Sequence, residues 1–164
     1  NNIKNISMDE PYAAICGITK EEMLEQMGGY IERFALSQEM SKEDTLLKLQ
    51  EKYDGYHFTW PSPDVFNPFS LLNAFEDGKL NSYWFGSGTP TYLIEMLRKF
   101  KVFPSAIGMK KALSTNFDAP TERSMTTIVP LLYQSGYITI KNYDKLTQLY
   151  TLDIPNGEIR VGLM

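Results

Sequence analysis

The chain has 164 residues, of which 43% are hydrophobic and 13% aromatic, and it carries a formal net charge of −4 at pH 7. This length and apolar content suffice for one domain or two small ones, and they exclude a disordered chain. One cysteine and one histidine exclude an internal disulfide and a zinc site built from Cys and His ligands. No apolar run reaches the length of about 18 residues that a membrane-spanning helix needs, and no signal-peptide pattern occurs at the N-terminus. We therefore expect a cytoplasmic protein without a membrane partner.

The charge is distributed unevenly along the chain. Residues 1–97 contain 7 basic and 15 acidic residues, a balance of −8, whereas residues 98–145 contain 8 and 3, a balance of +5. Residues 146–164 contain 1 basic and 2 acidic residues. The first part is expected to repel nucleic acid. The second has the sign that attracts it, although such clusters are also common on ordinary solvated surfaces.

The chain begins with the loop-like segment "NNIKNISMDEPYAAICG", which contains a short apolar run. Cys16 lies in this run, a position that favours a small buried residue over a nucleophile. At the other end, "LDIPNGEIRVGLM" stops where a further helix or strand begins. We therefore expect the chain to be an excised part of a larger protein.

Three helices are expected between residues 19 and 55. Two of them start at a Ser or Thr followed three positions later by an acidic residue, the spacing of a capping box. Consecutive glycines at 28 and 29 disfavour a helix interior, so they predict a break and a separate helix over 30–38. Gly55 should end the third helix. The capping pairs are Thr19 with Glu22 and Ser41 with Asp44. The expected apolar faces contain Met23, Leu24, Met27, Leu46, Leu49 and Tyr53.

Two further helices should begin at prolines. In Asn67–Pro68 and Thr89–Pro90 a capping side chain precedes a proline at the first helical position, where the missing N–H is not needed. These pairs predict helices over 68–76 and 90–101. Their expected apolar faces are Phe69, Leu72 and Phe75 in the first helix, and Leu93, Met96, Leu97 and Phe100 in the second.

The pattern changes after a linker-like stretch at residues 115–120. Residues 124–134 predict a helix with a kink or boundary at Pro130, and Gly136 should end it. The β-rich runs "YITIKNY" and "QLYTLDI" flank "DKLT" and predict a hairpin. Helix, glycine and hairpin in this order are typical of the end of a winged-helix module. The expected fold class is mainly α with a C-terminal β-hairpin, an α+β fold.

The stretch from Tyr53 to Phe85 is the densest in aromatic residues, too many for a solvated loop. Asp54–Gly55 within it predicts a turn directly after a helix. His57 is the only imidazole, and its aromatic neighbours favour a hydrogen-bonded packing histidine over a general base. Most of the large aromatic side chains should be core: Tyr53, Tyr56, Phe58, Phe66, Phe69, Phe75, Trp84 and Phe85.

The common catalytic motifs are not matched. The one Gly–Lys pair, Gly78–Lys79, lacks the first glycine and the hydroxyl residue of a P-loop, so nucleotide binding by that motif is excluded. No G-x-S-x-G elbow accompanies the single histidine. Pro63–Asp64 and the later Asp77–Gly78–Lys79 match the letters of a PD-(D/E)XK nuclease, but the second acid and the lysine follow a predicted helix rather than lie on a strand. We expect no catalytic residue, metal or cofactor in this chain.

Six blocks of the sequence stand in the order and spacing of a known family. They are "DEPYAAICGIT", "YDGYHF", "VFNPFSLLNAF", "YWFGSGTPTYLIEML", "LLYQSGYITIK" and "YTLDIPNGEIR". Over nearly its whole length the chain resembles the bacterial AAA-ATPase-like family. In that family a P-loop ATPase core precedes this region and a PD-(D/E)XK nuclease-like domain often follows it, so ATP and Mg would belong to the parent protein. The resemblance implies a helical lid-like region at 1–101 and a winged-helix-like region at 102–164, truncated at its C-terminal end.

These features predict a non-catalytic accessory region of a bacterial AAA-type ATPase that contacts its own upstream ATPase core and a downstream domain. Asp54, Gly55, Tyr56 and His57 form the candidate interface motif. Either these residues only pack, or they face the ATPase core and couple its nucleotide state to the downstream domain. At position 57 the family commonly has arginine, and a mostly neutral histidine would bind phosphate less well.

A nucleic-acid-binding winged-helix module is the alternative function, and a self-contained hydrolase is a third. The expected recognition helix, "SMTTIVPLLYQ", contains no Lys or Arg. Because duplex affinity and base recognition depend on such residues, any binding should be weak and sensitive to salt. The basic residues expected to make these contacts are Lys110, Lys111, Lys141 and Lys145.

Overall fold

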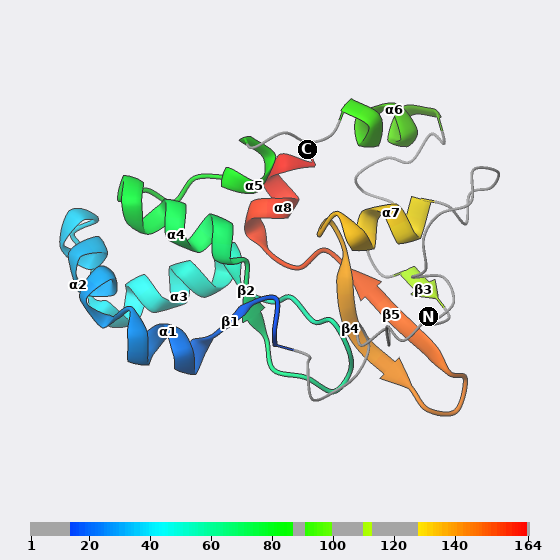
Figure 1. Ribbon diagram of the computed structural model, residues 1–164, viewed down its shortest axis with the longest axis horizontal. Helices are drawn as coiled ribbons and strands as arrows, with labels where there is room; N and C mark the ends of the chain where they lie inside the picture. Colours follow the sequence, from blue (N-terminus) through cyan, green and yellow to red (C-terminus); the bar gives the residue numbers. More distant parts are fainter. Residues whose placement is uncertain (1–13, 87–90, 100–109, 113–127, 164) are drawn as a thin grey trace, which may run out of the picture.

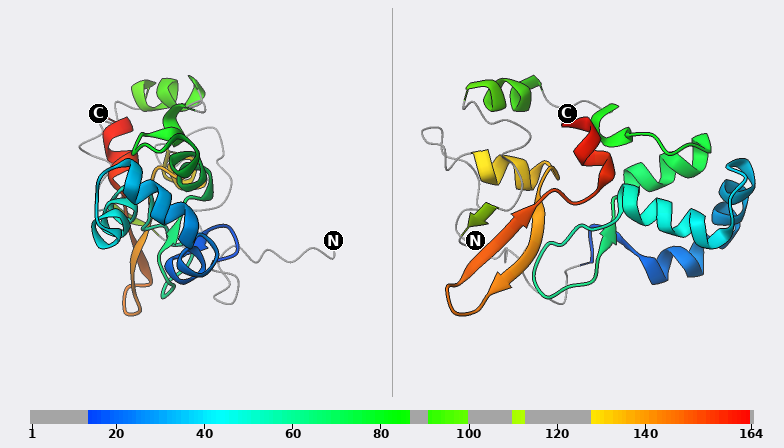
Figure 2. Two further views of the ribbon diagram at one scale, coloured as in Figure 1. Left: turned by 90° about the vertical axis from the view of Figure 1, so that its left-hand side faces the viewer. Right: turned by 180° about the vertical axis from the view of Figure 1, so that it is seen from behind.

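The computed structural model describes residues 14–86, 91–99, 110–112 and 128–163. Helices α1 to α4 gather at one end of the molecule, a three-stranded sheet lies at the other, and α5 and α8 lie between them (Figure 1). The view from behind shows the same division (Figure 2). The helices are α1 (Lys20–Gln26), α2 (Gly28–Ser37), α3 (Lys42–Tyr53), α4 (Pro68–Asp77), α5 (Tyr83–Gly86), α6 (Thr91–Lys99), α7 (Ile128–Gln134) and α8 (Gly157–Gly162). The strands are β1 (Ile18–Thr19), β2 (Val65–Phe66), β3 (Lys110–Ala112), β4 (Thr139–Asp144) and β5 (Leu149–Asp153).

The described strands form two antiparallel sheets. Strands β1 and β2 pair near the helices, and the second sheet has the order β3-β5-β4. Strands β4 and β5 form the expected C-terminal hairpin, so the fold class predicted from the sequence, mainly α with this hairpin, is confirmed. Helix α7 precedes the hairpin and the earlier strand β3 pairs with the last one, an order that agrees with a winged-helix-like module.

The predicted starts of α1, α3 and α4 are confirmed, whereas α2 begins at Gly28 rather than at residue 30. The Thr19 hydroxyl accepts a hydrogen bond from the N–H of Glu22, whose carboxylate accepts one from the N–H of Thr19. The side-chain oxygens of Ser41 and Asn67 cap α3 and α4 by accepting hydrogen bonds from backbone N–H groups of the first turn. The break between α1 and α2 falls at Met27, so the two glycines lie in the first turn of α2, where the helix-interior penalty on glycine does not apply.

The end of α7 is also as predicted. Gly136 has a φ of 75°, the left-handed conformation that ends a helix, and the N–H of Tyr137 reaches back to the carbonyl of Leu132. Pro130 is the third described residue of α7, and because residues 113–127 lie outside the described part, the kink or boundary expected at Pro130 stays a prediction. Several predictions lie outside the described residues: the cap at Thr89–Pro90, the position of Phe100, the linker at 115–120 and residues 124–127 of the expected helix.

The predicted buried face of α4 was wrong. Phe69 is 41% exposed and Leu72 50%, whereas the buried residues of this helix are Ser70, Leu71 and Ala74. On the buried face, Leu71 and Ala74 pack in the apolar cluster shared with α1 to α3, and the Ser70 hydroxyl donates to the buried carboxylate of Glu158 on α8. A polar residue is therefore inside, and two large apolar residues are left at the surface.

Two smaller burial predictions need similar correction. On α1, Met23 is buried but Leu24 is exposed. Cys16, expected to be a small buried residue, is exposed. The other predicted core aromatics agree better: Tyr53, Tyr56 and Phe66 are buried, and Phe58, Phe75, Trp84 and Phe85 pack half-buried against the core.

The core consists of two hydrophobic clusters. One joins α1 to α4 through residues that include Ile31, Phe34 and Leu49. The other joins Tyr56 and Val65 to α6, α7, the second sheet and α8. The second cluster takes residues from both sides of position 101, where the sequence suggested a boundary, and that boundary stays a prediction.

Candidate functional site

The candidate interface motif forms the junction between α3 and the second sheet. Helix α3 ends at Tyr53, and the chain turns at Gly55, which has a φ of 92°. A side chain at this position would be strained, and its Cβ would lie 2.5 Å from the carbonyl oxygen of Pro155. The glycine therefore allows residues 54–57 to approach the backbone that leads into α8.

Hydrogen bonds from this segment cross to residues about 80 to 100 positions later. The N–H of His57 donates to the hydroxyl of Thr139, which in turn donates to the carbonyl of His57, both at 2.8 Å. The hydroxyl of Tyr56 donates to the carbonyl of Gly136 at 3.1 Å. These hydrogen bonds attach Tyr56 to the residue that ends α7 and His57 to the first residue of β4.

Lys141 and Asn156 complete the junction from the sheet side. The ammonium group of Lys141 donates to the carbonyls of Gly55, at 2.6 Å, and Pro155, at 3.3 Å. Burial lowers the pKa of Lys141, against the opposing effect of nearby carboxylates. The side-chain amide of Asn156 donates to the carbonyl of Asp54 at 2.9 Å while its oxygen caps α8. We call residues 54–57 together with Thr139, Lys141 and Asn156 the junction.

Asp54 is the electrostatically unfavourable member of the junction. Its side chain is buried, and its Oδ1 atom has no hydrogen-bond partner among the described residues. Burial raises the pKa of Asp54 to about 6, and the N–H of Gly55 opposes the shift. The ionised carboxylate is less stable in this buried position than in water, so deprotonation of Asp54 lowers the free energy of unfolding.

His57 is held by a short network within its own loop. Its Nδ1 atom lies 2.9 Å from the hydroxyl of Ser62, and its Nε2 atom lies 2.5 Å from a carboxylate oxygen of Asp64. Burial lowers the pKa of His57, although the neighbouring carboxylate of Asp64 opposes this. The imidazole packs at 4.9 Å from the ring of Trp60. The geometry agrees with the packing histidine that the sequence favoured.

The nuclease-like letters are not arranged as a nuclease site. Asp64 is engaged with His57, whereas Asp77 is the last residue of α4 and Gly78 its left-handed C-cap, with a φ of 66°. Lys79 follows this cap and is exposed. The second acid and the lysine therefore lie at a helix end, as the sequence indicated.

Sequence reasoning missed one buried charge, Glu158 on α8. Its side chain is fully buried, and its Oε1 atom accepts hydrogen bonds from the N–H of Trp84, at 2.8 Å, and the hydroxyl of Ser70, at 2.9 Å. Its Oε2 atom has no partner among the described residues, and burial raises the pKa of this carboxyl. Asn156 before it predicts a helix start, but nothing in the local sequence indicates burial.

The four lysines suggested as nucleic-acid contacts have different surroundings. Lys145 is exposed in the turn between β4 and β5. Lys110 and Lys111 lie on β3, opposite Leu152 and Thr151. Lys141 is committed to the junction, which does not favour its use as a phosphate contact.

Among residues 14–86, 91–99, 110–112 and 128–163, no three His, Cys, Asp or Glu side chains are grouped so that they could hold a metal ion. Within that same part of the chain, no helix has the length and apolar character needed to cross a membrane.

The chain is similar to a protein of Azotobacter chroococcum mcd 1 named "Uncharacterized protein in vnfD 5'region". The two are 30% identical over 165 residues, which is 99% of this chain and 30% of that protein. The chain thus spans about a third of the length of the relative it matches. No family model matches the sequence, and no solved structure matches it.

Proposed function

We propose that the chain is a non-catalytic accessory region of a larger bacterial AAA-type ATPase of the cytoplasm. It would act through contacts with an ATPase core on one side and a further domain on the other. The order of the six sequence blocks supports this proposal. The similarity of the chain to one part of a protein about three times as long supports only the coarser statement that it is a region of a larger protein.

The junction is the observation that carries the proposed role. Asp54, Tyr56 and His57 are each 6% exposed, so they offer little surface to another domain. Their hydrogen bonds instead connect the end of α3 to β4 and to the start of α8. We therefore infer that these residues transmit movement from one part of the chain to another. If the ATPase core displaced α1 to α4, the junction would move the hairpin with them.

The substitution Gly55→Ala tests this role in the longer protein that contains the region. A Cβ at position 55 meets the carbonyl oxygen of Pro155, whereas a Cβ at Gly28 meets nothing within 4 Å, so Gly28→Ala is a matched control. We expect Gly55→Ala to change the rate of ATP hydrolysis at saturating Mg-ATP while the Kd for nucleotide stays within about twofold. Equal rates for wild type and both variants would contradict transmission through the junction.

A second measurement tests the non-catalytic part of the proposal. The 164-residue chain lacks the P-loop letters, so ATP and Mg would bind in the parent's core. Calorimetric titration of the chain with Mg-ATP should give no heat of binding. Micromolar binding would overturn the proposal in favour of an enzyme that is complete in this region.

Nucleic-acid binding is the second candidate function, and the arrangement of α7 with the sheet β3-β5-β4 favours it. The exposed Lys145 in the hairpin turn would contact phosphate, but α7 itself carries no Lys or Arg. Any such binding should therefore be weak and lose strength with salt.

A further inference from the structure

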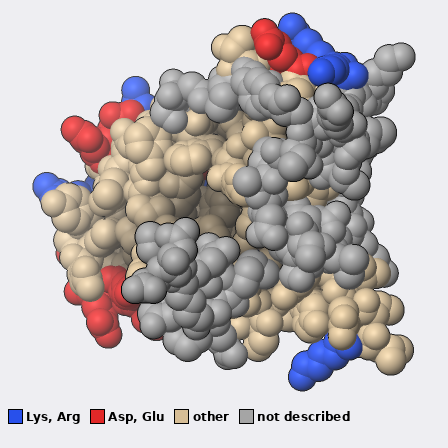
Figure 3. All heavy atoms as spheres, turned by 45° about the vertical axis from the view of Figure 1, so that its right-hand side comes forward, with Lys and Arg blue, Asp and Glu red and all other residues tan. Residues whose placement is uncertain are grey.

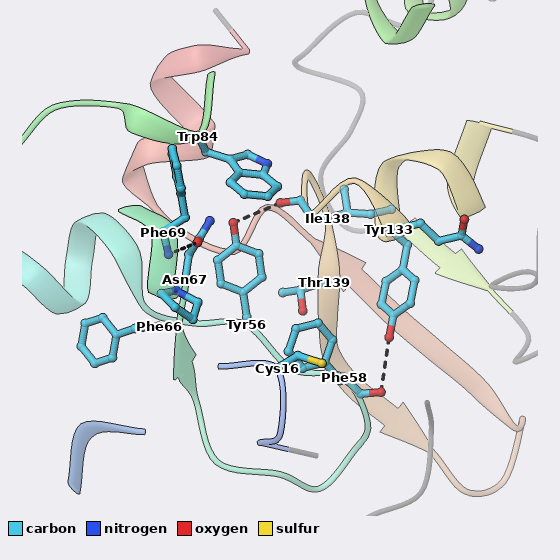
Figure 4. Close-up of a pocket in the computed structure, with 13 residues that line it drawn as sticks. Cys16, Tyr56, Phe58, Phe66, Asn67, Phe69, Trp84, Tyr133, Ile138 and Thr139 are labelled. Atoms are coloured by element: carbon cyan, nitrogen blue, oxygen red, sulfur yellow. Dashed lines mark hydrogen bonds between the residues drawn. The ribbon is translucent and has the colours of Figure 1, made fainter. Parts of the chain in front are cut away.

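A pocket with a volume of about 380 Å³ opens beside the junction. Its walls come from segments far apart in the sequence: α4 and α5 on one side, α7 and the start of β4 on the other, and the segment before β2 at the base (Figure 4). This volume is in the range of small-molecule sites, roughly 300–1,000 Å³. The side chains that give it its character are Cys16, Tyr56, Phe58, Phe69, Trp84 and Tyr133.

Six of the 13 described residues that line the pocket are aromatic. Phe69 and Trp84 meet edge to face, with ring centroids 6.0 Å apart and an interplanar angle of 72°. Tyr133 lies across the pocket from this pair, and Tyr56 lies between them (Figure 4). Phe69, on the misassigned face of α4, is 41% exposed. An exposed ring on a rigid helix beside a pocket is suited to contacting a ligand rather than to packing the core.

The polar atoms of these rings are already used inside the protein. The hydroxyl of Tyr56 donates to Gly136, that of Tyr133 to the carbonyl of Phe58 at 3.3 Å, and the indole N–H of Trp84 to the carbonyl of Ser135 at 3.0 Å. The Thr139 hydroxyl is likewise bonded to the backbone of His57. The rings therefore present their apolar faces and edges to the pocket.

Charge is absent from the described lining. None of the described residues that line the pocket is acidic or basic. On the face shown in Figure 3 the centre is hollowed, and the acidic and basic side chains drawn there lie towards its edges. A charged ligand would lose its hydration without an opposite charge to replace it, which is costly.

We propose that this pocket binds a small uncharged molecule built of aromatic rings. Ring contacts with Phe69, Trp84 and Tyr133 would supply the attraction, and the satisfied polar atoms would cost nothing further on binding. A polypeptide segment fits less well, because its backbone N–H and C=O groups would need partners and the ring hydroxyls and the indole N–H are already engaged. The pocket does not depend on the proposed accessory role, since its walls lie entirely within this chain.

The test uses N-phenyl-1-naphthylamine, an uncharged ring compound whose fluorescence rises in apolar surroundings, titrated into the 164-residue chain. We expect saturable binding of one molecule per chain. Phe69→Ala should weaken the affinity at least about tenfold, whereas Leu72→Ala should leave it within about twofold. Leu72 is the matched control because it is on the same helix, is 50% exposed and does not line the pocket.

A second pair of variants keeps the test decisive if Phe69→Ala does not fold. Cys16 is exposed and lines the pocket, whereas its neighbour Ile15 is 70% exposed and does not line it. Cys16→Trp should fill part of the pocket and abolish binding, while Ile15→Trp should leave the affinity within about twofold, with circular dichroism confirming that both are folded.

Three outcomes would overturn the proposal. The first is the absence of saturable binding to the wild type. The second is an equal loss of affinity in Phe69→Ala and Leu72→Ala, or no effect of Cys16→Trp, which would show binding elsewhere on the surface. The third is equal affinity for 8-anilinonaphthalene-1-sulfonate, which has the same rings and a negative charge, because the uncharged lining should disfavour it.

Discussion

Replacing Gly55 with alanine should destabilise the isolated chain through one identifiable clash. Residue 55 has a φ of 92°, and the added Cβ would lie 2.5 Å from the carbonyl oxygen of Pro155. A strained non-glycine conformation costs about 1–3 kcal/mol. We take about 2 kcal/mol as the expected loss in the free energy of unfolding, since relief of the contact requires movement of the backbone that precedes α8.

Thermal unfolding followed by circular dichroism measures this loss. For a chain of this size, about 2 kcal/mol corresponds to a decrease in Tm of roughly 4–8 °C. Gly28→Ala is the control: the position lies in the first turn of α2 with open space around it, and alanine there should raise the stability by about 0.4–1 kcal/mol, because it restricts the unfolded chain. If Gly55→Ala melts at the wild-type temperature, the close approach of residue 55 to Pro155 is refuted.

Four other outcomes follow from buried groups and surface charge. Tyr56→Ala should cost about 3–5 kcal/mol, because the ring is buried, whereas Tyr56→Phe should cost only about 0.5–1.5 kcal/mol for the hydrogen bond to Gly136, both measured by urea unfolding. The folded-state pKa of Asp54 is raised to about 6, so the folded chain binds the proton more tightly than the unfolded chain, and the free energy of unfolding should fall as pH rises from about 4 to 6. Asp54→Asn should remove this part of the pH dependence. An unchanged pH dependence would contradict the burial of the carboxyl. Glu158→Gln should equal or exceed wild-type stability at pH 7, because an amide keeps an acceptor for Trp84 and Ser70 without the buried charge, while Glu158→Ala should be less stable than either. Duplex DNA should bind weakly at low salt and lose that binding by 200 mM salt, a concentration at which retained sequence selectivity would favour the nucleic-acid alternative; Lys145→Ala should reduce the salt dependence.

The parts of the fold that were predicted from the sequence depend on local interactions. The N-cap residues bond backbone N–H groups only two or three positions away, so the local sequence alone predicts where these helices begin. They are Thr19, Ser41 and Asn67. The hairpin is local in the same sense, with β4 and β5 joined by a four-residue turn at 145–148.

The parts that were not predicted depend on distant partners. The buried face of α4 packs Leu71 and Ala74 against α1 to α3, and its Ser70 bonds Glu158, 88 residues later. An apolar count over the helix alone selected Phe69 and Leu72 instead. Cys16 was assigned to the core from its apolar neighbours, although the segment lies at the surface of a pocket made by later residues. Burial of a short apolar run is a tertiary property that its own residues do not determine.

The candidate site combines a locally predicted turn with partners that are distant in the sequence. The Asp–Gly pair predicts a turn from the local sequence, and this was sufficient to select residues 54–57. The partners Thr139 and Asn156 are 82 and 102 residues away and have no local signature, so the direction in which the motif faces could not be inferred. Its contacts go to the hairpin side of this chain, and the proposed role changes accordingly from direct contact to transmission.

Hydrogen–deuterium exchange on the longer protein tests transmission through the junction most directly. Amides of β4 and β5 should change their exchange rates when Mg-ATP is added to the wild type, because the junction connects the helices to the hairpin. In Gly55→Ala this response should be reduced, while it should persist in Gly28→Ala. If Mg-ATP binds to the wild type and the exchange of β4 and β5 does not change, or if Gly55→Ala responds as fully as the wild type, the junction does not transmit the nucleotide state.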